Sequence, residues 1–209
     1  MILEAAHAQN QKGNQTLGIG LGFSAATGSY NYQSNNPAIL DITASQSTGS
    51  FSANPNYSYF IANNLDLGVS IGFGSGTSNF DDNSANAHFK QIDKNYSGSL
   101  YMRKYILYKN KIGIRTGPYF SYQYFDSSYV DKSNNGSSSS NTGNNYHAGL
   151  IADFVYYPAS KIGLAVNIGN LSYNYGKANG PQQSSSSNGV NLQFLNNNLM
   201  LTAFYVFGK

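Results

Sequence analysis

The sequence predicts an all-β protein, an eight-stranded antiparallel up-and-down transmembrane β-barrel, and three observations predict it. Apolar residues alternate with small or polar residues over several long segments, which is the period of a β-strand. Asn and Ser, which weaken helices, make up more than a quarter of the 209 residues. Only 10% of the residues are charged, against roughly 25% in soluble globular proteins. These observations argue against a helical bundle, a coiled coil and an ordinary cytosolic enzyme.

The first strand is predicted to begin at Thr16, where Leu17 opens an alternation with glycines. Strands at 50–62 and 64–77 follow, and Ala62-Asn63-Asn64 between them predicts a tight hairpin, because Asn readily accepts a positive φ. A change of apolar parity predicts a β-bulge near 196–198 in the last strand. The remaining strands are expected at about 92–108, 111–126, 145–157, 161–175 and 190–207.

Long polar segments alternate with the short turns along the chain. We expect long loops at about 26–49, 78–91, 127–144 and 176–189, two of which contain low-complexity serine runs. In an up-and-down sheet, this order places the four long loops at one end and the three short turns, with both chain ends, at the other. Residues 16–207 are therefore predicted to form one barrel domain.

Residues 1–15 are predicted to be a disordered leader or the remnant of a signal peptide. Ala6-His7-Ala8 before Gln9 fits the small-x-small pattern of signal-peptidase cleavage, although no basic start or long apolar stretch precedes it. A short disordered leader is the alternative interpretation.

The apolar face of the strands is predicted to face lipid. The opposite face consists of Gly, Ser, Asn and a few charges, which supply too little bulk for a dry core. A soluble lipocalin-like barrel, which would bury the apolar face, is the alternative, and solubility without detergent would support it. The predicted lipid-facing residues are Leu17, Ile19, Leu21, Phe23, Leu67, Val69, Ile71, Phe73, Leu164 and Val166. Aromatic residues near strand ends predict interfacial girdles, with Tyr57, Tyr59, Tyr122, Tyr124 and Tyr156 as members.

The chain resembles the small eight-stranded outer-membrane barrels of Gram-negative bacteria, the OmpA/OmpX type. The resemblance rests on the strand and turn rhythm over about 16–207, on the segment 59–68 and on the closing segment 203–207. It implies outer-membrane localisation among lipid and lipopolysaccharide, assembly by the barrel-insertion machinery, periplasmic termini and extracellular long loops. One departure is that Gly208-Lys209 follow Phe207, whereas the family's assembly signal often ends on the aromatic residue.

Four charged residues are predicted to meet inside the barrel. The strand parity points Arg103, Arg115, Asp153 and Asp66 inward, and two like charges in a narrow lumen require carboxylates. We expect this ion-pair network to plug the lumen, because eight strands leave room only for side chains. A charged constriction that selects solutes is the alternative.

No catalytic residue, metal site or cofactor is predicted. Catalysis on lipid A needs a nucleophile beside a base, and none of His7, His88 and His147 has the His-x-Ser pattern of barrel deacylases. Asp81-Asp82-Asn83 lacks the spaced ligands of a calcium loop, and the sparse positive charge gives no nucleic-acid patch.

The predicted function is therefore that of a non-enzymatic, porin-like outer-membrane barrel. It would support the envelope or bind a surface protein or host ligand through its loops, as an adhesin does. A narrow pore for small solutes is the second hypothesis, and a lipid A-modifying enzyme is the third.

Overall fold

The computed structural model describes residues 9–32, 42–82, 87–132, 138–180, 184–194 and 200–208. The described part contains no helix that is long and apolar enough to cross a membrane. Its strands are β1 (Gln15–Tyr32), β2 (Ile42–Ala62), β3 (Leu65–Asp82), β4 (Ala87–Tyr108), β5 (Ile112–Asp131), β6 (Ser138–Ala159), β7 (Ile162–Asn179), β8 (Ser184–Phe194) and β9 (Met200–Phe207).

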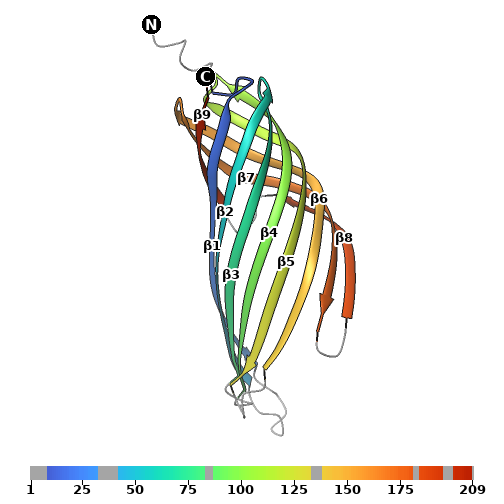
Figure 1. Ribbon diagram of the computed structural model, residues 1–209. Coiled ribbons are helices and arrows are strands. Elements are labelled where there is room, and N and C mark those ends of the chain that lie inside the picture. Colours follow the sequence, from blue (N-terminus) through green and yellow to red (C-terminus); the bar gives the residue numbers. More distant parts are fainter. Residues whose placement is uncertain are drawn as a thin grey trace.

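The strands form a ring in chain order. Each strand from β1 to β7 pairs with the next in antiparallel fashion, and β9 pairs with both β7 and β1 (Figure 1). β8 pairs with the outer part of β7, so β8 and β9 together take the eighth position. The predicted eight-stranded antiparallel up-and-down barrel is confirmed.

The ring is closed at one end and open along one seam at the other. Pairing between β1 and β9 ends at Gly22 and Met200. From Phe23 to Tyr32, β1 pairs only with β2 among the described residues, and β8 pairs only with β7. Figure 1 shows β8 set apart from β1. The outer half of the barrel therefore has two strand edges that face no partner within the described ranges.

A β-bulge interrupts the register between β6 and β7. The pairs Asp153↔Asn167 and Ala152↔Gly169 leave Ile168 as an extra residue. The outward parity of β7 therefore changes at Ile168, where the alternation was expected to continue. The described part of β1 pairs with β2 in an unbroken register, so it has no matching shift. The bulge expected near 196–198 lies outside the described residues.

The short turns agree with the sequence prediction. Asn64 ends the first turn with a φ of 61°, and Lys109 and Asn110 have φ values of 49° and 54°. The two consecutive positive angles give the hairpin the twist that flanking strands prefer. Gln15 pairs with Phe207, so the described chain ends lie at the same end as the short turns.

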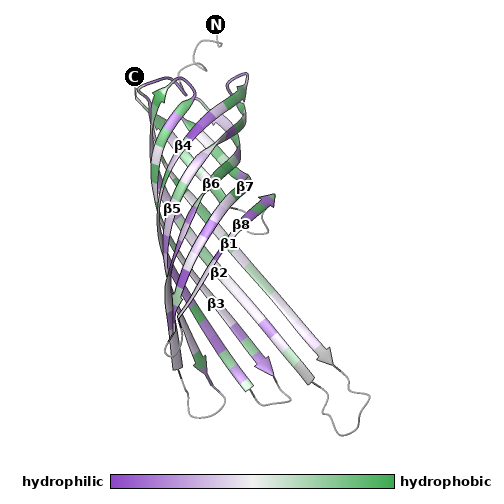
Figure 2. Cartoon of the chain, turned by 90° about the vertical axis from the view of Figure 1, so that its right-hand side faces the viewer, coloured by the Kyte–Doolittle hydropathy of each residue, from purple (hydrophilic) through white to green (hydrophobic). Residues whose placement is uncertain are grey.

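The expected long loops are wrong in extent, because strands occupy most of them. Of the predicted loop at 78–91, residues 78–82 belong to β3 and 87–91 to β4, and the other three segments are shortened in the same way. The run Ser184–Ser187 lies in β8, paired with β7. Ladder hydrogen bonds from a neighbouring strand stabilise polar segments that have little intrinsic strand preference. The strands therefore extend far from the end that carries the short turns (Figure 2).

Part of the predicted leader is also folded. Residues 9–14 pack against the turn end of the barrel, where Gln9, Asn10 and Asn14 are buried, and Gln15 already belongs to β1. The prediction of a disordered leader is therefore wrong for residues 9–15. His7 and the rest of 1–8 lie outside the described residues.

Candidate functional site

The four predicted lumen charges form two ion pairs. Arg103 donates from Nε to Asp66 Oδ1 at 3.1 Å and from Nη2 to Oδ2 at 2.6 Å. Arg115 donates from Nε to Asp153 Oδ2 at 2.7 Å. Each pair joins residues directly opposite each other on neighbouring strands, β3 with β4 and β5 with β6. All four side chains are buried, so each charge is compensated within the lumen.

Neutral side chains join the two pairs. The Tyr105 hydroxyl donates to Asp66 Oδ2 at 3.0 Å and accepts a 3.5 Å contact from Arg115 Nη1. Asp66 Oδ2 also accepts from Ser58 at 2.8 Å, and the Asn167 amide donates to Asp153 Oδ1 at 3.1 Å.

The resulting hydrogen-bond network runs along the inner face of the barrel wall from β1 to β7. Its first link is the 2.7 Å hydrogen bond between the Thr16 and Ser58 hydroxyls. We call this network the polar belt, and its members are Thr16, Ser58, Asp66, Arg103, Tyr105, Arg115, Asp153 and Asn167. A hydrogen-bonded layer that touches seven successive strands holds them in register and fills the lumen at this level.

Below the polar belt, toward the short turns, the lumen is apolar. Val155, Tyr157, Phe204 and Val206 pack together there and are almost fully buried. This cluster was not predicted, because the inner face was expected to be uniformly small and polar. The sequence did indicate it, because the alternation of β6 and β9 places bulky residues on the inward face near the end with the short turns.

Residues 9–14 close this end of the barrel. The Tyr157 hydroxyl donates to Asn10 Oδ1 at 2.7 Å, and the Asn64 amide donates to the Asn10 carbonyl at 2.7 Å. The Gln9 side chain reaches the Ala159 carbonyl at 3.4 Å. The lumen is thus blocked by three successive layers: the polar belt, the apolar cluster and the amino-terminal segment.

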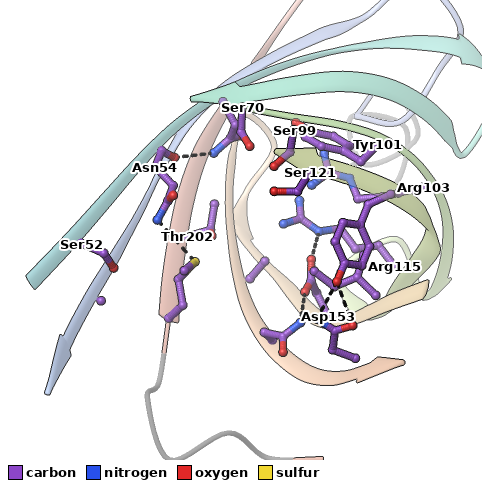
Figure 3. A pocket seen from close by; sticks show the side chains of 18 of the residues that line it. Ser52, Asn54, Ser70, Ser99, Tyr101, Arg103, Arg115, Ser121, Asp153 and Thr202 are labelled. Atoms are coloured by element: carbon purple, nitrogen blue, oxygen red, sulfur yellow. Dashed lines mark hydrogen bonds and ion pairs between the residues drawn. The ribbon is translucent and has the colours of Figure 1, made fainter. Parts of the chain in front are cut away.

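Above the polar belt lies a cavity of about 450 Å³ (Figure 3). Serine, asparagine and threonine side chains dominate its wall, and Tyr101 and Tyr119 lie next to the polar belt. The Tyr101 ring packs against Gly68, where a Cβ atom would lie 2.5 Å from the ring. Glycine at position 68 therefore makes room for the floor of the cavity.

The outer wall carries exposed apolar side chains. The exposed fraction is 50% for Leu67 and 71% for Ile71. The other predicted lipid-facing residues of β1 and β3 are also exposed, whereas Leu164 and Val166 on β7 are only half-exposed. The predicted girdle residues Tyr57, Tyr59, Tyr122, Tyr124 and Tyr156 all have exposed side chains.

The two histidines in the described ranges, His88 and His147, lie on different strands and have different partners. His88 contacts Asp81 at 2.8 Å on the outer part of β3 and β4. His147 contacts Asn174 and stands opposite Ser121 in the β5–β6 register, yet no hydrogen bond joins His147 to Ser121 in the structure. The described residues contain no group of three or more acidic or histidine side chains placed to hold a metal ion. Asn83 lies outside the described residues.

Comparison with known proteins shows a likeness in fold. No protein-family model matches the chain, and no curated protein matches it. Among solved structures, the attachment invasion locus protein Ail of Yersinia pestis is 17% identical with a TM-score of 0.45, over 94% of this chain and 100% of that chain. A major outer membrane protein of Thermus thermophilus is 16% identical with a TM-score of 0.45, over 92% and 99%. The outer membrane protein OprG of Pseudomonas aeruginosa is 11% identical with a TM-score of 0.41, over 96% and 99%. At these identities and scores, the likeness carries no inference about function.

Proposed function

We propose that this protein is a non-enzymatic outer-membrane β-barrel with a closed lumen, which acts through the part of its sheet that projects beyond the membrane. The observation that carries the proposal is the combination of an exposed apolar outer wall with a lumen blocked by buried ion pairs. A soluble barrel would place the apolar face inside, whereas here the buried face holds the charges.

The spacing of aromatic residues supports a particular position of the barrel in the membrane. Tyr146 and Tyr156 are both exposed on the outward face of β6, ten residues apart. Ten residues span ~33 Å along a strand, and a tilt of ~40° reduces this to ~25 Å, the height of the apolar band in outer-membrane barrels. β4 has 22 residues, about twice what one crossing needs. The excess lies at the end away from the turns and forms the proposed surface region.

This arrangement favours support of the envelope or surface interaction over conduction. The orientation that follows has the turns and both termini in the periplasm and the extended strands outside the cell. The partner at the surface would be a protein or host ligand, reached by the outer strand ends.

Three assays test the proposal. Refolding from urea should give a heat-dependent gel mobility shift and a strong β signal in circular dichroism only when detergent or lipid is present. In planar bilayers the refolded protein should show no steady ion current. A folded protein in plain buffer would refute the membrane assignment, and a steady current in the wild type would support the narrow pore. Release of acyl chains from lipopolysaccharide would support the enzyme.

A further inference from the structure

We propose that the cavity above the polar belt binds a neutral, hydroxyl-rich ligand of the size of one or two sugar rings. This binding site goes beyond the proposed envelope role and does not depend on it. A volume of about 450 Å³ lies within the range of ~300–1,000 Å³ that is typical of small-molecule sites.

A row of serine hydroxyls forms one wall of the cavity. Ser70 stands directly opposite Ser99, and Ser99 stands directly opposite Ser121, so the row crosses β3, β4 and β5 at one level. Figure 3 shows the three side chains next to one another. None of the three hydroxyls has a hydrogen-bond partner among the described residues. We call this wall the serine row, and each member offers one donor and two acceptor positions to a ligand.

The neighbouring strands of the cavity wall carry amide and hydroxyl groups. Asn54 and Ser52 come from β2, and Thr202 comes from β9 (Figure 3). The Asn54 amide contacts only the sulfur of Met200, at 3.8 Å, which is a weak acceptor. The cavity therefore has free hydrogen-bonding groups on β2 and β9 as well as on β3, β4 and β5.

The charges of the floor select against an ionic ligand. Arg103, Arg115 and Asp153 line the cavity, and each is held in an ion pair with a short contact. The two pairs together carry no net charge, so an ion that entered would lose water and gain no free counter-charge. A neutral sugar replaces water hydrogen bonds with hydroxyl and amide hydrogen bonds at little such cost. Tyr119 offers a partly exposed ring beside these groups, on which a sugar face can pack.

The polar belt closes the cavity at its floor. The cavity also extends to the open seam beside β1. Gly22 and Met200, the last paired residues of β1 and β9, both line it, together with Phe23 just beyond. A ligand can therefore arrive from the outer end as a free saccharide, or sideways as the sugar of a lipid. The chemistry that recognises the two is the same.

The test uses the full chain refolded in lauryldimethylamine oxide, a detergent whose headgroup contains no sugar. Maltose is titrated and binding is followed by calorimetry and by amide chemical shifts. We expect saturable binding, and at least tenfold weaker binding of glucuronate, which carries a charge. Each serine-to-alanine change in the row should weaken maltose binding about fivefold. The matched control is Ser75→Ala on the outward face of β3, which should leave the affinity unchanged.

Dodecyl maltoside distinguishes the two sources. Affinities for maltose and dodecyl maltoside that lie within threefold of each other indicate that the ligand is a free saccharide. A preference of tenfold or more for dodecyl maltoside over maltose, with both affinities weakened in Ser99→Ala, indicates a lipid-linked sugar that uses the seam. Binding of neither compound, equal binding by Ser99→Ala and Ser75→Ala, or equal binding of glucuronate would overturn the proposal. The gel mobility shift confirms that each variant is folded.

Discussion

The polar belt is expected to be a structural layer, and Arg115→Leu tests this directly. The substitution removes the 2.7 Å bond to Asp153 and the 3.5 Å contact to the Tyr105 hydroxyl. Asp153, with an exposed fraction of only 6%, then keeps Asn167 as its side-chain donor and no cation. Removal of one member of a buried ion pair costs about 3–5 kcal/mol.

The expected effect is large enough for a simple unfolding assay. With a urea dependence of about 2 kcal/mol/M, a loss of about 4 kcal/mol lowers the unfolding midpoint by about 2 M. The chain contains 18 Tyr and no Trp, so unfolding in lipid vesicles is followed by tyrosine fluorescence and by gel mobility. The double variant Arg115→Leu/Asp153→Leu removes both charges and should be more stable than the single variant.

The outward-facing Lys104→Leu serves as the control for the loss of a cation on the neighbouring strand, and we expect no decrease in its midpoint. An unchanged midpoint in Arg115→Leu, together with an altered ion current in planar bilayers, would refute the structural interpretation. It would instead identify the belt as a selectivity constriction.

Three further substitutions probe particular contacts. Gly68→Ala places a Cβ atom 2.5 Å from the Tyr101 ring and should cost about 1–3 kcal/mol in unfolding free energy, whereas Gly98→Ala, with nothing within 4 Å of its Cβ, should cost much less. Ile71 faces outward in the proposed membrane region, so Ile71→Lys should destabilise the vesicle-inserted barrel by about 2–4 kcal/mol. Thr77 faces outward on the same strand but farther from the turns, so Thr77→Lys should change the stability little. Equal effects of the two substitutions would contradict the proposed membrane position. Tyr157→Phe removes the 2.7 Å bond to Asn10 and should cost about 1 kcal/mol and speed proteolysis near residues 9–14, and unchanged proteolysis would argue against closure by this segment.

The strand pattern and the lumen charges could be predicted from the sequence, because both depend on the two-residue alternation of side chains along a strand. Alternation around Leu67 and Ile71 set the outward face, and the same parity placed Asp66, Arg103, Arg115 and Asp153 on the opposite face. The register then follows from the hairpin turns, which is why residues predicted only by parity stand directly opposite each other. In the β4–β5 register Arg115 stands opposite Tyr105, and Arg103 lies two residues farther along β4, so the two arginines are close without being directly opposite.

The joining residues of the belt were missed because Ser58, Tyr105 and Asn167 resemble many other polar or aromatic residues of the chain. Only the assembled ring shows that their atoms meet the charged groups.

The sequence by itself determined the all-β class, the order of strands and short turns, and which face of each strand is apolar. These properties are local, since they depend on side-chain alternation and on turn residues that accept a positive φ. The tertiary structure decided how far the strands extend into the Asn- and Ser-rich segments, where the seam opens and what closes the lumen. These properties depend on hydrogen bonds and packing between strands: a serine run becomes a strand when β7 supplies a ladder, and the seam opens where the pairing of β1 with β9 ends at Gly22.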